Sequence, residues 1–422
     1  MNPIKQIGLA ALTFGLLAGV AHAQETMAAV LQNVQQSEWG DNFVGQAGGS
    51  SAVMTREPIL SPGTVPAMQQ AIARYQDIVS RGGWPNVPAD HPLKLGMREP
   101  AIAALRERLM AEGDLNAASG DPQAFDSYVQ AAVRRFQVRY GIFADGSVGK
   151  ETLAAMNIPA DFRLNQLQVN IQRIGAMGSP EGRYVLVDIP AAQIEVVENG
   201  QLVQRHTATV GRIDRQTPLL SSRLTEINFN PYWHVPPSLI VKDLIPRMQK
   251  DPNYLKESEI HIYTQSGQEV DSSQVNWNSD EATHYLFRQD PGEHNSLGHV
   301  KINFSNPYSV YLHDTPEKGF FGSNYRFESS GCMRVQNVRE LVTWILRDNG
   351  YDSGRVDEEI RSGNRLDVKV ANAPALFTVY ISAWASSDGV VHFRDDIYKM
   401  DQSSNAVALN QNPSMIGSPD TE

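Results

Sequence analysis

The stretch that decides the fold reads Tyr311-Leu312-His313-Asp314-Thr315-Pro316 and resumes, nineteen residues after the histidine, as Ser329-Ser330-Gly331-Cys332-Met333-Arg334-Val335. Cys332 is the only cysteine of the chain, so no intramolecular disulfide can form. A lone cysteine is by default a small buried hydrophobic residue. The nearby histidine favours a reactive thiol instead, because a cysteine attacks as its thiolate and a neighbouring base promotes ionisation.

Local sequence predicts how these side chains are held. Residues 309–312 are typical of a strand that His313 closes, and Cys332 lies on a loop before a predicted helix. Gly331 lets the backbone approach a substrate carbonyl, and we expect the N–H groups around Gly331 and Cys332 to form an oxyanion hole. Arg334, two residues beyond the cysteine, would point to the same side of an extended loop and suits an anionic group.

Beyond residue 183 the apolar periodicity changes from 3.6 to 2, which predicts a mainly-β half. The predicted strands are residues 184–189, 193–197, 201–210, 301–304, 309–312 and 376–382. Asn199-Gly200 is a tight hairpin signal. Residues 232–288 break the pattern with Pro236-Pro237, one predicted helix over 239–250 and a polar stretch. We interpret this segment as an insertion that acts as a mobile lid.

Helical spacing dominates the N-terminal half. Apolar residues three and four apart predict a helix from about Val65 that ends at Gly82-Gly83, within a helical scaffold segment over 64–92. Residues 93–158 predict a small three-helix module. Its apolar stripes are Ile102, Leu105 and Leu109, and then Tyr128, Val129, Ala132, Val133 and Phe136. The predicted fold class is therefore α+β multidomain.

The two ends of the chain carry different signals. An uncharged stretch over 7–20 precedes Ala21-His22-Ala23, a small-x-small cleavage pattern, so residues 1–23 are typical of a secretory signal peptide. Residues 24–63 predict a flexible leader, and residues 399–422 predict a disordered tail. We expect export, with no membrane span after signal cleavage.

Charge and histidine spacing bear on partners and cofactors. The net charge of -11 disfavours a nucleic-acid partner, because phosphate binding depends on clustered Lys and Arg. His284, His294, His299 and His313 accompany Cys332, but their spacing matches no compact metal-ligand pattern. We expect no metal and no cofactor.

The quoted segment resembles the signature of the L,D-transpeptidase (YkuD) family, in which a histidine is followed, after a spacer, by Ser-His-Gly-Cys-x-Arg. The resemblance extends over 65–398 to the large, periplasmic YcbB-like branch, through Ser296-Leu297-Gly298, Val300-Lys301 and Asp395-Asp396-Ile397-Tyr398. Residues 93–158 resemble the peptidoglycan-binding domain, through the runs at 132–137 and 145–152.

The resemblance implies a mainly-β catalytic domain over 183–398, with residues 232–288 as a capping insertion. It implies Cys332 as the nucleophile, His313 as the base and the backbone carbonyl of Asp314 as the group that orients His313. It assigns substrate contact to Tyr311 and Arg334. We expect Ser329 and Ser330 of the same loop to contact substrate as well. Position 330 departs from the family pattern, which usually has histidine there.

The reaction implied by the resemblance is cross-linking of peptidoglycan stem peptides in the periplasm. Cys332 attacks the L-centre carbonyl of meso-diaminopimelate in a tetrapeptide stem, D-alanine leaves, and an amine of a second stem resolves the thioester. Carbapenems inhibit this family by acylating the thiol. The implied partners are stem peptides, glycan strands and other cell-wall synthesis enzymes.

Alternatives remain open at this level. Water in place of the acceptor amine would make the same site an L,D-carboxypeptidase. An NlpC/P60-like endopeptidase has its cysteine ahead of its histidine, whereas here only His392 follows Cys332. A non-catalytic wall-binding protein with a decayed catalytic domain is a third alternative, suggested by Ser330 in place of the family's histidine.

Overall fold

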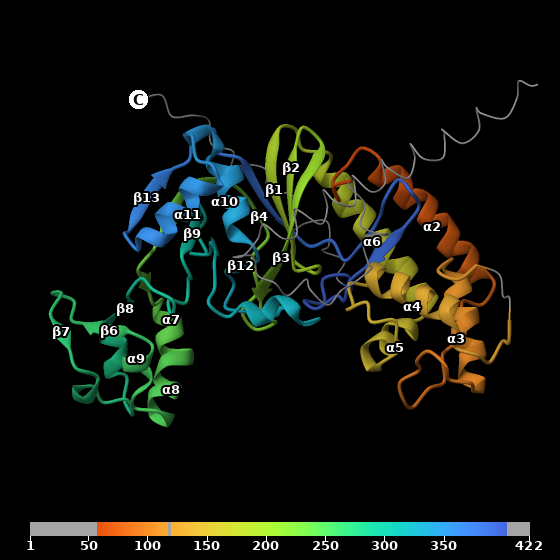
Figure 1. The fold of residues 1–422 in the computed structure, drawn as a ribbon, viewed down its shortest axis with the longest axis horizontal. Coiled ribbons are helices and arrows are strands. Elements are labelled where there is room, and N and C mark those ends of the chain that lie inside the picture. The colour runs from red at the N-terminus through yellow and green to blue at the C-terminus, as the bar shows by residue number, and fades with distance from the viewer. Residues whose placement is uncertain (1–56, 117–119, 403–422) are drawn as a thin grey trace, which may run out of the picture. The chain divides into compact units, whose positions relative to one another are not determined.

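The computed structural model describes residues 57–116 and 120–402. The predicted signal peptide, residues 24–56 of the leader and residues 403–422 of the tail lie outside the described residues. The chain passes from a group of helices into a large mixed sheet that carries an inserted subdomain (Figure 1). No helix in the described ranges is long and apolar enough to cross a lipid bilayer.

Within the described residues, five helices precede the sheet. They are α2 (Thr64–Ser80), α3 (Pro100–Ala111), α4 (Ser127–Arg139), α5 (Lys150–Met156) and α6 (Ala160–Met177). Helix α2 ends before Gly82 and Gly83, as predicted, and both glycines have positive φ. The sequence pattern did not predict α6, because polar side chains occupy much of its buried face. The buried polar residues of α6 are Arg163, Gln166, Asn170 and Arg173.

Helices α3, α4 and α5 form the predicted three-helix module. Its apolar stripes are buried, with Ile102, Leu105, Leu109, Val129, Ala132, Val133 and Phe136 all 0% exposed. The exception is Tyr128, which is 69% exposed and does not join the core. Asp126 caps α4 by accepting a hydrogen bond from the Val129 N–H at 2.9 Å. The module's core is continuous with Tyr184 and Leu186 of the sheet, so the two parts share one hydrophobic cluster.

The main sheet has ten strands, in the order β11-β3-β12-β10-β9-β4-β14-β1-β2 with β13 on β4. They are β1 (Arg183–Asp188), β2 (Gln193–Glu198), β3 (Gln201–Gly211), β4 (Leu220–Phe229), β9 (Val300–Phe304), β10 (Leu312–His313), β11 (Phe327–Ser329), β12 (Met333–Val335), β13 (Leu366–Lys369) and β14 (Ala375–Val379). Strand β3 pairs with β2 as well as β12, so the path of pairings closes on itself.

Most predicted strands are confirmed, and so is the hairpin between β2 and β3. Asn199 and Gly200 both have positive φ, 51° and 76°, as the two central residues of a type I′ turn require. The strand predicted over 309–312 is wrong at its start. Ser309 has a φ of 57°, and the Asn306 side chain binds the Val310 N–H and carbonyl, which makes a turn there. Strand β10 therefore holds only two residues.

Two helices, α10 (Val338–Leu346) and α11 (Ser353–Ser362), pack against the sheet (Figure 1). Leu341, Val342 and Ile345 of α10 are 0% exposed and join the cluster formed by Val187, Leu312 and other sheet residues. The remaining short elements are the hairpin of β15 (Ala383–Ala385) and β16 (Val391–Phe393) and the 3-10 turns η3 (Ser272–Gln274), η4 (Glu281–His284), η5 (Lys318–Gly322) and η6 (Arg347–Asn349).

The insertion is more structured than the sequence indicated. It has a four-stranded sheet of β5 (Trp233–His234), β8 (Leu286–Gln289), β6 (Ile260–Tyr263) and β7 (Glu269–Val270), together with α7 (Pro237–Leu239), η2 (Ile240–Leu244), α8 (Ile245–Lys250) and α9 (Tyr254–Glu257). It has its own hydrophobic cluster, including Leu244 and Phe287. The sequence indicated only one helix and a polar stretch here, so this core corrects that expectation.

The helix predicted over 239–250 is interrupted by the π-helical turn η2. Pro246, the second residue of α8, has no N–H to donate to the carbonyl four residues earlier, so the regular ladder of hydrogen bonds is interrupted at this point. The predicted helix is present, but it is divided into the consecutive short segments α7, η2 and α8.

Both predicted boundaries of the folded body need correction. The leader does not reach residue 63, because Ile59 and Leu60 are each 2% exposed and the Ile59 N–H donates to Glu195 at 2.8 Å. The tail does not begin at 399, because Asp401 is 3% exposed. Both segments carry groups that complete buried hydrogen bonds, which composition does not reveal.

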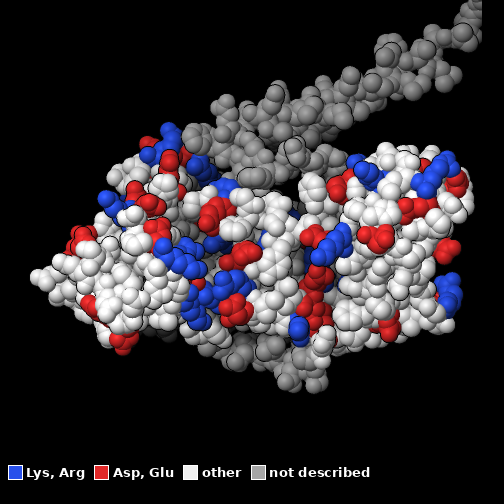
Figure 2. All heavy atoms as spheres, turned by 90° about the horizontal axis from the view of Figure 1, so that it is seen from below, with Lys and Arg blue, Asp and Glu red and all other residues white. Residues whose placement is uncertain are grey.

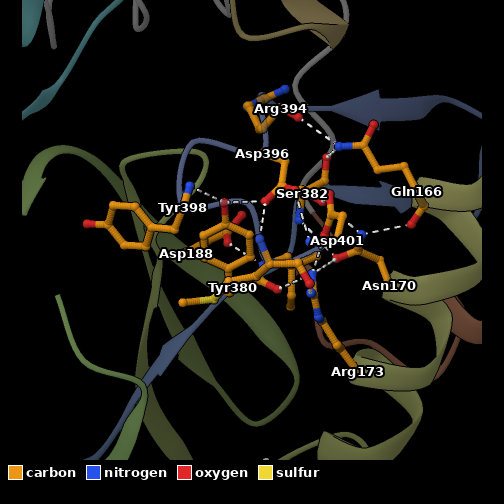
Figure 3. A network of polar contacts seen from close by, with 12 residues as sticks. Gln166, Asn170, Arg173, Asp188, Tyr380, Ser382, Arg394, Asp396, Tyr398 and Asp401 are labelled. Atoms are coloured by element: carbon orange, nitrogen blue, oxygen red, sulfur yellow. Dashed lines mark hydrogen bonds and ion pairs between the residues drawn. The ribbon is translucent and has the colours of Figure 1, made fainter. Parts of the chain in front are cut away.

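Asp401 belongs to a polar network between α6 and the C-terminal segment (Figure 3). Its carboxylate accepts from Arg173 Nη1 and from the Ser382 hydroxyl, both at 2.6 Å. Asn170 donates to the same hydroxyl at 2.8 Å. The Asp401 N–H donates to Asp396 at 2.9 Å, and Asp396 also accepts from the Tyr380 hydroxyl. The network therefore anchors residues 396–401 to α6.

Asp401→Ala should lower the free energy of unfolding by about 3–5 kcal/mol, because it leaves the Arg173 guanidinium buried without its carboxylate. Gln402→Ala is the matched control, since Gln402 is exposed and should change stability little. Urea unfolding of both variants checks this. Equal stability of the two would mean that the C-terminal segment does not anchor the fold.

Candidate active site

The site is built on three adjacent strands. Strand β10 pairs in parallel with β12, which sets Leu312 opposite Met333 and His313 opposite Arg334. On its other side β10 pairs antiparallel with β9, which sets His313 opposite Lys301. The Met333 N–H also donates to the Tyr311 carbonyl at 3.0 Å, so the ladder continues one residue before β10.

Strand alternation then decides which side chains meet. Leu312 and Met333 are 0% exposed and point into the core. Successive side chains of a strand point to opposite faces, and paired residues share a face. The residues on either side of these two therefore share the opposite face of the sheet. They are Tyr311, His313, Cys332 and Arg334.

His313 is 5% exposed, and its Nδ1 lies 2.5 Å from the Asp314 carbonyl oxygen. A carbonyl only accepts, so Nδ1 carries the hydrogen and Nε2 presents a lone pair. Burial lowers the pKa of His313 to about 3, with a further contribution from the Arg334 charge. The imidazole is therefore neutral at physiological pH, the form that a general base requires.

Cys332 is half-buried, and burial raises the pKa of its thiol. Contacts with Tyr311 and the positive charges of Lys301 and Arg334 act in the opposite direction on that pKa. Burial also raises the pKa of Tyr311 well above its usual value, so its hydroxyl stays protonated beside the thiol. Among the described residues, no hydrogen bond joins the thiol to His313. A contact of this kind often tightens only when substrate binds.

The loop before Cys332 has hydrogen bonds that bear on two predicted site residues, Ser329 and Gly331. The Ser329 hydroxyl is 4% exposed, donates to the Cys332 carbonyl at 2.5 Å and accepts from the Gly331 N–H at 3.1 Å. Ser329 therefore braces the loop and is not available to substrate. The Gly331 N–H already donates to this hydroxyl, so its oxyanion role stays a prediction that requires this hydrogen bond to be replaced. The Cys332 N–H makes no hydrogen bond within the described residues.

Thr217 holds the other side of this loop. Its hydroxyl donates to the Gly331 carbonyl and accepts from the Gly211 N–H, both at 2.9 Å. Because the carbonyl and the following N–H of a trans peptide point in opposite directions, this bond turns the Cys332 N–H away from Thr217. The Tyr398 hydroxyl fixes the neighbouring Gly211, because it donates a hydrogen bond to the Gly211 carbonyl at 2.5 Å. Tyr398 also belongs to the C-terminal network of Figure 3, so this network is connected through Gly211 and Thr217 to the loop that carries Cys332.

Ser330 connects the same loop to the insertion. It is exposed, and its hydroxyl lies 2.8 Å from Arg215 Nη1. Arg215 also makes two contacts with Asp243 of η2, at 2.7 and 3.1 Å. A second contact with the insertion comes from Trp233 of β5, whose side chain acts to lower the pKa of the Tyr311 hydroxyl. The insertion therefore meets the site at two points.

Arg334 lies on the site face as predicted, but it already has partners. Its Nη1 is 2.9 Å from Glu317, and its guanidinium lies 4.8 Å from the ring centre of Phe320 in η5. An anionic substrate group would have to share or displace Glu317. Glu317 is 62% exposed, which makes displacement feasible.

Charge at the site comes from nearby groups. Basic and acidic side chains are interspersed on the face shown in Figure 2, and screening limits the influence of distant surface charges to roughly 8 Å at physiological ionic strength. No group of three or more His, Cys, Asp and Glu side chains that could hold a metal ion occurs in residues 57–116 and 120–402.

Sequence reasoning missed Thr217, Arg215 and Trp233, because hydrogen bonds across the fold place them and no local pattern marks them. It also missed Lys301, for which a signal existed. The strand Val300-Lys301-Ile302-Asn303-Phe304 alternates apolar and polar residues, so Lys301 had to face away from the core.

Thr217→Val should destabilise the protein, because it leaves the Gly331 carbonyl and Gly211 N–H unsatisfied at about 1–3 kcal/mol for each group. Thr217→Ser, which keeps the hydroxyl, is the control. Urea unfolding distinguishes the two. If valine and serine give the same stability, these two hydrogen bonds do not hold the loop.

Comparison with known proteins agrees with this arrangement. Residues 182–366 match the model of the YkuD family, the L,D-transpeptidase catalytic domain. Residues 98–156 match the family described as "Putative peptidoglycan binding domain". A Haemophilus influenzae protein named "Putative L,D-transpeptidase" is 31% identical over 246 residues, which are 58% of this chain and 50% of that protein. The chain thus spans about half the length of this curated relative.

Solved structures show weaker likeness. An L,D-transpeptidase from Xylanimonas cellulosilytica is 17% identical with a TM-score of 0.23, over 69% of this chain and 99% of that chain. One from Mycobacterium smegmatis is 15% identical with a TM-score of 0.24, over 48% and 60%. TM-scores this low do not define a common fold, so the assignment depends on the family matches. By those matches, residues 182–366 form an L,D-transpeptidase catalytic domain of the YkuD family, and residues 98–156 form a peptidoglycan-binding domain in the same chain.

Proposed function

We propose that this protein is a periplasmic L,D-transpeptidase that joins peptidoglycan stem peptides through a thioester on Cys332. The observation that carries the proposal is the strand register that sets Tyr311, His313, Cys332 and Arg334 on one face. The alternatives with a decayed site or with cysteine ahead of histidine are less well supported, because His313 is held neutral with Nε2 ready to accept a proton.

In the first half-reaction, His313 Nε2 takes the thiol proton while Cys332 Sγ attacks the carbonyl carbon of the donor stem. The tetrahedral intermediate places negative charge on the carbonyl oxygen. The Cys332 N–H, turned outward by Thr217, is the donor available to that oxygen. The intermediate then collapses, the bond to the D-alanine nitrogen breaks, and His313 gives its proton to the leaving amine.

In the second half-reaction, the amine of an acceptor stem attacks the thioester carbon and the carbon–sulfur bond breaks. His313 accepts a proton from the attacking amine, and the thiol is reprotonated. Water can make the same attack, which would give an L,D-carboxypeptidase. The insertion favours the amine, because the Arg215–Asp243 pair and the Trp233 contact hold a folded subdomain against the site, and such a cover limits access of water.

The other parts of the chain suit this assignment. The pattern over residues 1–23 supports export to the periplasm, where peptidoglycan lies. The peptidoglycan-binding domain would hold the enzyme on glycan strands. Its core is continuous with that of the catalytic domain, so binding there would bring the active site to its polymer. Other cell-wall synthesis enzymes are candidate partners.

The direct test incubates the purified protein with disaccharide-tetrapeptide and analyses the products by mass. Wild type should release D-alanine and form a cross-linked dimer, and a carbapenem should add covalently. Cys332→Ala should do none of these. His313→Ala should keep its fold and acylate ~100-fold to 10,000-fold more slowly, the usual range for a positioned general base.

The other possible outcomes distinguish the proposed function from its alternatives. Release of D-alanine without dimer would favour the carboxypeptidase. An adduct on Cys332→Ala would show that the nucleophile is another residue. Absence of all products, with glycan binding retained, would favour the non-catalytic wall-binding protein.

A further inference from the structure

Lys301 is the second residue of β9 and lies directly opposite His313 in the pairing with β10. Its Nζ is 4.4 Å from the centre of the Tyr311 ring, the residue whose hydroxyl contacts the Cys332 thiol. A lysine packed on the face of an aromatic ring has a defined position, because the ring quadrupole attracts the cation. Lys301 is thus held close to the nucleophile.

The Lys301 charge is not neutralised by an ion pair within residues 57–116 and 120–402. The two nearest carboxylates that influence it, Glu226 and Asp367, have other partners. Glu226 pairs with Lys369, and Asp367 with Arg365, each at 2.6 Å. Partial burial lowers the pKa of Lys301, which shows that the ammonium is incompletely solvated. A partly buried charge without an ion pair costs free energy, which a nearby anion would offset.

The other groups around Cys332 do not offer a free positive charge to its thiolate in the resting enzyme. His313 is neutral, because its pKa is about 3. Arg334 is paired with Glu317 and packed on Phe320. The remaining neighbour, Tyr311, contributes only an uncharged hydroxyl. In the part of the chain that the structure describes, Lys301 is the group near the thiol whose positive charge has no ion pair.

We propose that the Lys301 ammonium is the positive charge that stabilises the Cys332 thiolate, and that Tyr311 positions it. The thiol proton passes to His313 Nε2, and the sulfur keeps the electron pair that forms the thioester bond. Lys301 stays protonated throughout and exchanges no proton. This inference deepens the proposed function, since it concerns the same nucleophile, but it describes a property of the free enzyme.

The test is the rate of Cys332 alkylation by iodoacetamide as a function of pH, which needs no peptidoglycan. Because burial places the pKa of Cys332 above its usual value, the rate should rise with pH through the neutral range. Lys301→Met removes a charge that lowers this pKa, so the curve should move to higher pH and the rate at pH 7 should fall at least about tenfold. Lys301→Arg should stay within about threefold of wild type.

Lys250→Met is the control for loss of one charge, since Lys250 is exposed in α8 of the insertion. Its profile should match wild type. Circular dichroism confirms that each variant is folded, and Lys301→Gln replaces the methionine variant if that one is not. A Lys301→Met or Lys301→Gln profile that coincides with wild type would overturn the proposal. Failure of the tetrapeptide reaction alone would overturn the proposed function and leave this inference standing.

Discussion

The parallel pairing of β10 with β12 is the constraint on which the site depends. It places His313 opposite Arg334, and its continuation by one residue places Tyr311 beside Cys332. Two apolar residues, Leu312 and Met333, set this register, because each is fully buried. A shift of one residue would turn His313 and Cys332 into the core and these two out to solvent. The hydrophobic core therefore determines which face of the sheet carries the candidate site.

The remaining structure keeps a two-residue strand in place. Lys301 of β9 flanks it on one side, and Ser329 and Thr217 hold the loop that carries Cys332. Thr217 depends on Tyr398, and through it on a buried network that ends at helix α6. Helix α6 therefore helps to hold the loop that carries Cys332. The apolar residues of the helices before the sheet also share a hydrophobic cluster with β1. Hydrogen bonds between residues far apart in the sequence therefore help to fix the position of the Cys332 loop beside the two-residue strand β10.

The local sequence pattern was sufficient to predict much of the fold. The 3.6 and 2 periodicities located the three-helix module and most strands, and Asn199-Gly200 located a hairpin, because these features depend on neighbours in sequence. Helix α6 was missed because its buried face is polar. The insertion was underestimated because its core comes from short segments such as β6 and β8. At the site, pattern singled out Cys332 and His313 but did not reveal the hydrogen bonds of Gly331 and Ser329, which depend on loop geometry.

The central claim is that this one face of the sheet performs acyl transfer at Cys332. A crystal structure of the protein trapped with a tetrapeptide stem tests it most directly. The account predicts a thioester from Cys332 Sγ to the diaminopimelate carbonyl carbon. It also predicts the carbonyl oxygen within hydrogen-bond distance of the Cys332 N–H and His313 Nε2 facing the vacated amine position. A stem bound elsewhere, with the thiol of Cys332 unmodified and His313 Nε2 turned away, would contradict it.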